Sequence, residues 1–187
     1  TTTQVVALGT SQVASLTTKQ LAAMTTTQIV AMETSDLAVV TTSQLAGLTT
    51  AQMAAMTTTQ VVGLGSTQVS VLTTKQLAAM TTTQIAAMET ADLAAITTAN
   101  ITGLTTAQVA GMGTTQVSSL TTSQLVAMTT AQIAAIETAD VAAMGTTQVA
   151  ALTTAQVVGL GSTQISSMTT TQLVAMTTAQ IAAIQTA

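Results

Sequence analysis

The stretch TTAQIAAI, residues 129–136, is the clearest copy of an eight-residue unit that repeats along the whole chain. Counted from Thr1, the 187 residues form 23 complete octets and a three-residue remainder, Gln185-Thr186-Ala187. The consensus is T-T-x-Q-(V/I/L)-A-A-(L/M), and its places are called positions 1 to 8 below. Self-similarity at a fixed period is typical of repeat architectures. We therefore expect residues 1–187 to form a single continuous octapeptide-repeat array, a segment of a longer chain.

The spacing of the apolar residues decides between helix and strand. Positions 5 and 8 are apolar in every octet. At a spacing of i, i+3 they share one face of a helix, but in a strand their opposite parity would send them to opposite faces. One continuous helix is excluded, because an octet turns about 800° and the apolar pair would spiral around its surface. The sequence predicts an all-α solenoid of very short helices, one per octet and about six residues long, with a β-solenoid as the alternative.

Positions 1 and 2 are used to place the helix boundaries. Position 1 is usually Thr but is Gly or Glu in several octets, whereas position 2 is always Thr or Ser. Gly is favoured just past a helix C-terminus in a left-handed conformation, and Thr or Ser is a favoured N-cap. These preferences predict that position 2 caps a helix over positions 3 to 8. The alternative makes position 1 the N-cap, with Gln at position 4 completing a capping box.

The remaining positions suggest how the coils pack. Positions 6 and 7 are mostly Ala or another small residue, which predicts close approach of two backbones there. Gln occupies position 4 in 19 octets. We expect its amide to bond between coils, as a glutamine ladder or to the backbone at the Thr-Thr bends, with a sugar-binding row as the functional alternative. The regular Thr rows resemble those of ice-binding solenoids, which remain a remote alternative.

All acidic residues fall in three octets, which start with ETSD or ETAD. Paired carboxylates beside Thr oxygens suit a hard cation, so they are weak candidates for calcium binding. The simpler interpretation is that Asp at position 4 lies in a first helical turn and complements the helix dipole. The six candidates are Glu33, Asp36, Glu89, Asp92, Glu137 and Asp140.

A longer period is superimposed on the octets. The octets that begin with Glu start at 33, 89 and 137, which are 56 and then 48 residues apart. Gly-led octets with Ser-rich helices start at 9, 65, 113 and 161 and keep the same spacing. Because copies of seven and of six octets both occur, we interpret the octet as the structural unit and the longer period as a trace of duplication.

Composition excludes several classes of function. The chain contains no aromatic residue, Cys, Pro, His or Arg, and its net charge is -4. Without His, Cys, a phosphate-binding loop or a Ser beside a base, we expect no catalytic residue, no cofactor and no enzyme activity. The acidic balance with only two lysines argues against nucleic acid as a partner. No run of about 18 apolar residues occurs, so we expect no membrane span.

The repeated TTxQ(V/I/L)AA(L/M) unit resembles the Thr- and Gln-rich octapeptide arrays of very large secreted surface proteins of Gram-negative bacteria, which are often labelled adhesins. The resemblance covers all 187 residues. It implies an extracellular or cell-surface location and a structural role in a stalk, fibre or sheath. It carries over no catalytic or binding residue.

The leading hypothesis is a structural extracellular protein that forms a rod, filament or sheath by stacking of repeats and by self-association. Interface hot spots are enriched in Trp, Tyr and Arg, and this chain has none of them, which favours the chain itself as its partner. The alternative is an adhesin stalk or multivalent module that binds glycan or another cell surface through many weak contacts.

Overall fold

A computed structural model shows an all-helical solenoid with one short helix per octet, as the apolar spacing predicts. The structure describes residues 1–185, and this part of the chain contains no strand, so the β-solenoid alternative is wrong. The α-helices are four to eight residues long, and octet 13 forms a 3-10 helix instead. The elements are α1 (Thr2–Val6), α2 (Thr10–Ser15), α3 (Thr18–Ala22), α4 (Thr26–Ala31), α5 (Thr34–Ala38), α6 (Thr42–Ala46), α7 (Thr50–Ala55), α8 (Thr58–Val62), α9 (Ser66–Val69), α10 (Thr74–Ala79), α11 (Thr82–Ala87), α12 (Thr90–Ala95), η1 (Ile101–Gly103), α13 (Thr106–Ala110), α14 (Thr114–Ser119), α15 (Thr122–Ala127), α16 (Thr130–Ala134), α17 (Thr138–Ala143), α18 (Thr146–Ala151), α19 (Thr154–Gly159), α20 (Ser162–Ser167), α21 (Thr170–Ala175) and α22 (Thr178–Gln185).

Each helix starts one residue earlier than predicted, so that position 1 is the N-cap. In α4 the N-cap Thr25 has extended backbone angles, and its Oγ1 accepts a hydrogen bond from the Gln28 N–H at 3.2 Å. The Gln28 Oε1 in turn accepts from the Thr25 N–H at 2.8 Å. This reciprocal pair is a capping box. The prediction that position 2 is the N-cap is therefore wrong, and the capping-box alternative is right.

Gly is tolerated at position 1 because half of the capping box needs only the backbone N–H there. The Gly145 N–H donates to the Gln148 Oε1 at 2.7 Å, although Gly145 has no side-chain oxygen to return the bond. The predicted left-handed Gly is also wrong, since no described residue has a positive φ. The helices end without a left-handed residue, because the backbone at position 8 is extended. Met32 (φ -67°, ψ 141°) shows this, and its N–H still bonds to the Ile29 carbonyl at 3.2 Å.

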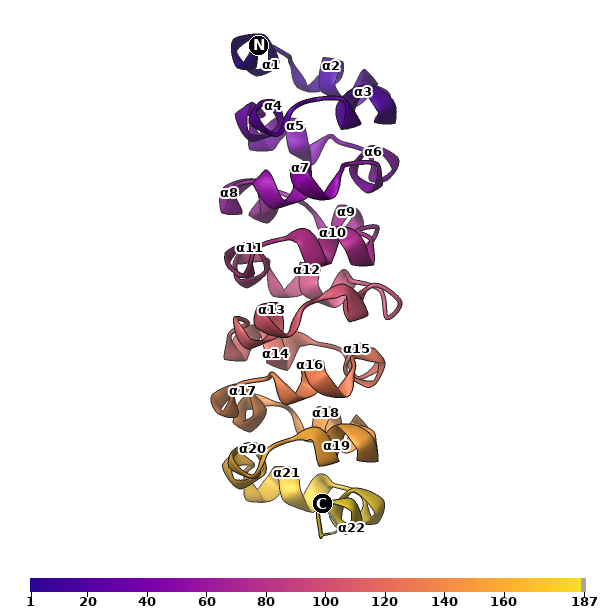
Figure 1. Cartoon of the computed structure of the whole chain (residues 1–187), viewed down its shortest axis with the longest axis vertical. Helices are drawn as coiled ribbons and strands as arrows, with labels where there is room; N and C mark the ends of the chain where they lie inside the picture. The colour runs from indigo at the N-terminus through magenta and orange to yellow at the C-terminus, as the bar shows by residue number, and fades with distance from the viewer. Residues whose placement is uncertain (186–187) are drawn as a thin grey trace.

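The octets wind into a rod with the two termini at opposite ends (Figure 1). Each helix packs against the helix three octets further along the chain, as α4 does against α1 and α7, and α7 against α10. Side-chain hydrogen bonds described below reach four octets back. One superhelical turn therefore contains between three and four octets.

The core is a thin column of the residues at positions 5 and 8, as predicted. Leu77 is fully buried and Met80 is 3% exposed, and the same two positions repeat this pattern along the rod. Without aromatic residues, the column is filled by Val, Leu, Ile and Met, of which Met adapts best to irregular gaps.

Only one of the two small-residue positions lies at a close backbone approach. Position 6 faces solvent, where Val126 is 45% exposed. Position 7 packs against position 2 of the octet three before it. A Cβ added to Gly103 would lie 2.5 Å from the Thr74 Cα, and one added to Gly47 would lie 2.0 Å from the Thr18 Cγ2. The prediction thus holds for position 7 and fails for position 6, and position 2 is an inter-coil packing position.

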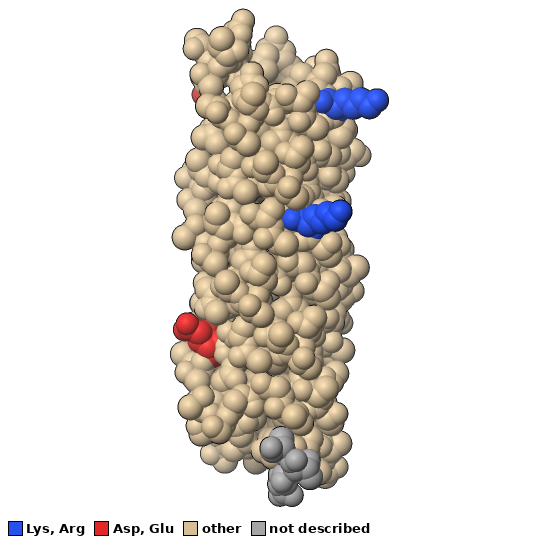
Figure 2. Space-filling view, viewed as in Figure 1, with Lys and Arg blue, Asp and Glu red and all other residues tan. Residues whose placement is uncertain are grey.

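The longer period also fits the geometry of the rod. Because a turn contains between three and four octets, six or seven octets correspond to about two turns, and both spacings return a feature to nearly the same side of the rod. The two lysines of the chain, Lys19 and Lys75, are 56 residues apart. Figure 2 shows both basic side chains towards the right-hand side of the rod.

The corrected cap assignment can be tested with two isosteric substitutions in one octet. Thr129→Val removes the oxygen that accepts from the Gln132 N–H at 3.2 Å, so we expect a loss of about 0.5–2 kcal/mol in unfolding free energy. Thr130→Val, at the first helical position, is the control and should have a much smaller effect. Urea denaturation followed by circular dichroism measures both. A larger loss at Thr130 would restore the original assignment.

Candidate functional site

The position 4 glutamine is the side chain that joins one coil to the next. Gln124 is the third residue of α15 and is 1% exposed. Its Oε1 accepts from the Thr121 N–H at 2.9 Å, which caps its own helix. Its Nε2 donates to the Leu93 and Ile96 carbonyls of the octet four before it, at 2.8 and 2.7 Å. One buried amide thus satisfies backbone groups at the start of one helix and at the end of another.

This arrangement repeats along the rod. The position 8 carbonyl lies beyond the helical turn, where helix ends leave acceptors without an intrahelical partner. The structure confirms the predicted bonds from Gln to the backbone, and the amides that make them are buried and cannot form a sugar-binding row. The glutamines whose Nε2 reaches the coil four octets back are Gln44, Gln52, Gln60, Gln68, Gln76, Gln84, Gln108, Gln116, Gln124, Gln132, Gln148, Gln156, Gln164, Gln172 and Gln180.

The predicted calcium candidates separate into buried aspartates and exposed glutamates. Asp36, Asp92 and Asp140 take the place of Gln in the first turn of α5, α12 and α17, and they are 3%, 4% and 4% exposed. Glu33, Glu89 and Glu137 are the exposed N-caps of the same helices, and their side chains make no cap hydrogen bond.

These six residues do not converge on a cation site. Among the residues that the structure describes, no group of three or more acidic, His or Cys side chains could hold a metal ion. Each Glu and Asp pair stays in its own octet, and α5, α12 and α17 lie at different heights of the rod (Figure 1). The position of each Asp in a first helical turn fits the helix-dipole interpretation.

The partner of an acidic octet was missed by sequence reasoning. Ser66 Oγ, at position 2 of a Gly-led octet, donates to the Asp92 Oδ1 at 2.6 Å. The two octets are neighbours in the stack, where α12 packs against α9. A signal was present, since each Glu-led octet starts 24 residues after a Gly-led one, as Glu89 does after Gly65. Its meaning depends on the number of octets per turn, which the sequence does not reveal.

Burial changes the acidity of one aspartate. The pKa of Asp140 is raised above its usual value, first because burial removes water from the carboxylate and second because the negative charge of Glu137 is nearby. A carboxylate also has no hydrogen to donate to a carbonyl of the coil below. We therefore expect the ionised Asp140 to destabilise the packing between coils locally.

Octet 13 is a second irregular place. Its position 4 residue is Asn100, whose side chain is one methylene shorter than Gln and caps no backbone group. The Asn100 N–H still reaches the Thr97 Oγ1 at 3.3 Å, but the segment folds as the 3-10 helix η1. A short position 4 side chain does not by itself cause this change, because α5, α12 and α17 are α-helices with Asp at position 4.

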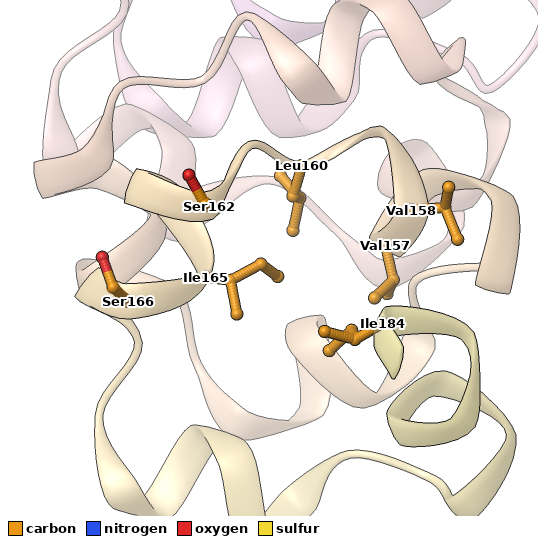
Figure 3. A pocket seen from close by; sticks show the side chains of 7 residues that line it. All are labelled: Val157, Val158, Leu160, Ser162, Ile165, Ser166 and Ile184. Carbon is orange, nitrogen blue, oxygen red and sulfur yellow. The ribbon is translucent and has the colours of Figure 1, made fainter. Parts of the chain in front are cut away.

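Two of the hollows on the described part of the rod are lined by no titratable side chain. One is a shallow groove lined by Thr98, Thr122, Ser123, Val126, Ala127 and Ala151. The other lies at the C-terminal end and has a volume of about 450 Å³. Its lining is Val157, Val158, Leu160, Ser162, Ile165, Ser166 and Ile184 (Figure 3).

A family model for the ALTTAQ repeat matches residues 1–26, 29–66, 54–82, 85–122 and 133–170, which together cover most of the chain. The chain belongs to the ALTTAQ repeat family. Residues 151–156 spell this motif, which runs from the end of α18 through the capping box of α19. No curated protein and no solved structure matches this ALTTAQ repeat chain.

The helices of the ALTTAQ array are also too short to cross a bilayer. No helix in the described part of the chain is both long and apolar enough to span a membrane.

The donor role of the glutamine can be tested by replacing its side-chain NH₂ group with an oxygen. Gln124→Glu keeps an oxygen for the capping box but removes the N–H₂ and buries a carboxylate against the Leu93 and Ile96 carbonyls. We expect a loss of at least about 1–3 kcal/mol, the cost of an unsatisfied buried group. Ser123→Glu adds the same charge at the exposed neighbouring position and is the control. Equal urea midpoints for the two variants would contradict the coil-to-coil role of the amide.

Asp140 predicts a pH dependence of stability. Because its folded pKa is raised, the folded protein binds more protons than the unfolded chain between the two pKa values, so stability falls as pH rises through this window. We expect Asp140→Asn to be more stable than the wild type at neutral pH, with the difference shrinking towards pH values below the usual Asp range. Glu137→Gln removes the second cause and should reduce the pH dependence in part. Thermal denaturation across a pH series gives the stability of the wild type and of both variants. A stability difference between Asp140→Asn and the wild type that grows on acidification would reject this account.

Proposed function

We propose that this ALTTAQ repeat array is a structural rod that associates with copies of itself in an extracellular or cell-surface fibre, stalk or sheath. The observation that carries the proposal is that the glutamine amides form hydrogen bonds inside the rod. The repeated amides bond backbone to backbone across coils, as the Gln124 Nε2 does at 2.8 Å from the Leu93 carbonyl. The side chains that could bind a ligand at high density are therefore committed to building the rod.

The outer surface supports the same proposal. Its exposed residues are mostly Thr, Ala and Ser, and Figure 2 shows few charged side chains on one face of the rod. Only modest electrostatic repulsion opposes the association of such surfaces. A catalytic role is disfavoured, because the two hollows described above are lined by no acid or base. The extracellular or cell-surface location is supported by the resemblance to arrays of secreted bacterial proteins.

The adhesin alternative makes a different demand on the surface. Multivalent binding to a glycan would rely on exposed rows at positions 1 to 3, because the buried position 4 amides are occupied. An isolated array that binds no glycan and no cell surface would therefore favour the structural rod.

We expect concentration-dependent assembly into rods or filaments with little dependence on salt, since few ion pairs are available. Static light scattering over a concentration series at low and high salt gives the mass, and electron microscopy gives the shape. A chain that remains monomeric at high concentration and binds tightly to a glycan array would replace this proposal with the adhesin alternative.

A further inference from the structure

The acidic octets leave backbone acceptors without a donor inside the rod. In a regular octet the Gln Nε2 donates to the position 8 carbonyl four octets back. Asp92 and Asp140 replace this Gln, and the carbonyls below them, those of Leu64 and Met112, accept no hydrogen bond from any described residue. Leu64 is nevertheless 2% and Met112 3% exposed. Both places lie in the middle of the rod, where neighbouring octets are present on both sides.

The carboxylates at the same places also lack donors. Asp92 and Asp140 are each 4% exposed. The Asp92 Oδ1 accepts from the Ser66 Oγ, whereas its Oδ2 and both oxygens of Asp140 accept no hydrogen bond from a described residue. These oxygens keep a little contact with solvent, since no fully enclosed side-chain oxygen of the described residues lacks a partner. A carboxylate and a carbonyl that are buried together need a positively charged or donating partner, and here it must come from solvent.

A Gly-led octet packs against each acidic octet and adds a third oxygen. This is the contact of α9 with α12, of α14 with α17 and of α2 with α5. Leu64, Gly65 and Ser66 are consecutive, so the hydrogen bond from Ser66 places the Asp92 carboxylate beside the segment that carries the free carbonyl. A Cβ added to Gly65 or Gly113 would meet no atom within 4 Å. The glycine therefore leaves open space beside the carbonyl and the hydroxyl.

Charge favours a divalent cation as the missing partner. Each acidic octet carries two carboxylates, an exposed Glu at position 1 and a buried Asp at position 4, and no basic residue. Lys19 and Lys75 lie in other octets, and no ion pair joins them to a carboxylate in the described part of the chain. Ca²⁺ binds carboxylate, carbonyl, hydroxyl and water oxygens in irregular geometry, whereas Mg²⁺ demands a near-ideal octahedron.

We propose that each acidic octet binds one calcium ion between its Asp carboxylate, the position 8 carbonyl four octets back and the position 2 hydroxyl of the Gly-led octet. The ion replaces the Gln Nε2 as the link between coils, and water completes its coordination. The exposed Glu adds attraction at the rim without being a ligand. The three sets of ligands are Asp36, Leu8 and Thr10; Asp92, Leu64 and Ser66; and Asp140, Met112 and Thr114.

This site differs from the calcium site first considered from the sequence. It uses one carboxylate with backbone and hydroxyl oxygens, so it does not need the group of three or more acidic side chains that the described residues lack. It also concerns a single rod and is independent of the proposed self-association. Calcium would stabilise the packing between coils at three heights of the rod.

The test restores the regular unit at all three places. The triple variant Asp36→Gln, Asp92→Gln and Asp140→Gln supplies the amide that the carbonyls lack, so we expect it to fold and to lose its response to calcium. The matched control is Glu33→Gln, Glu89→Gln and Glu137→Gln, which removes the same charge from exposed positions. Thermal denaturation is followed by circular dichroism in EDTA, in calcium chloride up to about 10 mM and in sodium chloride of equal ionic strength.

We expect the midpoint of the wild type to rise with calcium, and calorimetric titration to give one ion per acidic octet with a dissociation constant of about 0.1–1 mM. The control should keep this stoichiometry with weaker binding, and the Asp-to-Gln variant should have the same midpoint in calcium and in sodium chloride. A wild-type midpoint that is no higher in calcium than in sodium chloride would overturn the proposal, because water or protons would then pair with the carboxylates. An equal calcium response of the two variants would also overturn it, since net charge alone would then attract the ion.

Discussion

The rod depends on one constraint, which is that the backbone groups at the ends of very short helices must find partners. An α-helix leaves four N–H and four C=O groups unpaired at its ends, and a helix of about six residues has few others. The capping box and the turn at position 8 satisfy part of this demand. The rest is met by the position 4 amide, as Gln124 shows with one bond to the Thr121 N–H and bonds to two carbonyls of the coil below. Fixing this amide fixes the distance and the register between coils.

The tolerance of each position follows from this constraint. Position 5 must be apolar because it is enclosed on all sides, and position 8 must be apolar because it closes the column. Position 1 needs only a backbone N–H for the Gln bond, so Gly145 is accepted there. Position 7 has little room where it meets position 2 of another coil, and at Gly103 an added Cβ would meet the Thr74 backbone. Departures at position 4 have visible effects, since Asn100 is followed by a 3-10 helix and Asp140 has a raised pKa.

The uneven longer period fits the same geometry. A turn of between three and four octets is not a whole number of units, so a copied block of seven octets or of six comes close to two turns. Copies of either length return their Gly-led and Glu-led octets to similar sides of the rod and to the same neighbours in the stack. The hydrogen bond from Ser66 to Asp92 is one such neighbour contact, made between octets whose starts are 24 residues apart. The interpretation of the longer period as a trace of duplication is therefore compatible with the stacking of the coils.

The sequence by itself determined that the chain is a helical solenoid, because apolar residues three apart can share a helix face and cannot share a strand face. It also determined the core positions and the composition of the surface. The tertiary structure decided the helix register, because Thr129 and Thr130 are both good N-caps and only the bond from Gln132 distinguishes them. It also decided which coil each amide reaches and which octet lies beside each aspartate. These features depend on the number of octets in a superhelical turn, and that number results from packing between residues far apart in the sequence, which an eight-residue pattern does not contain.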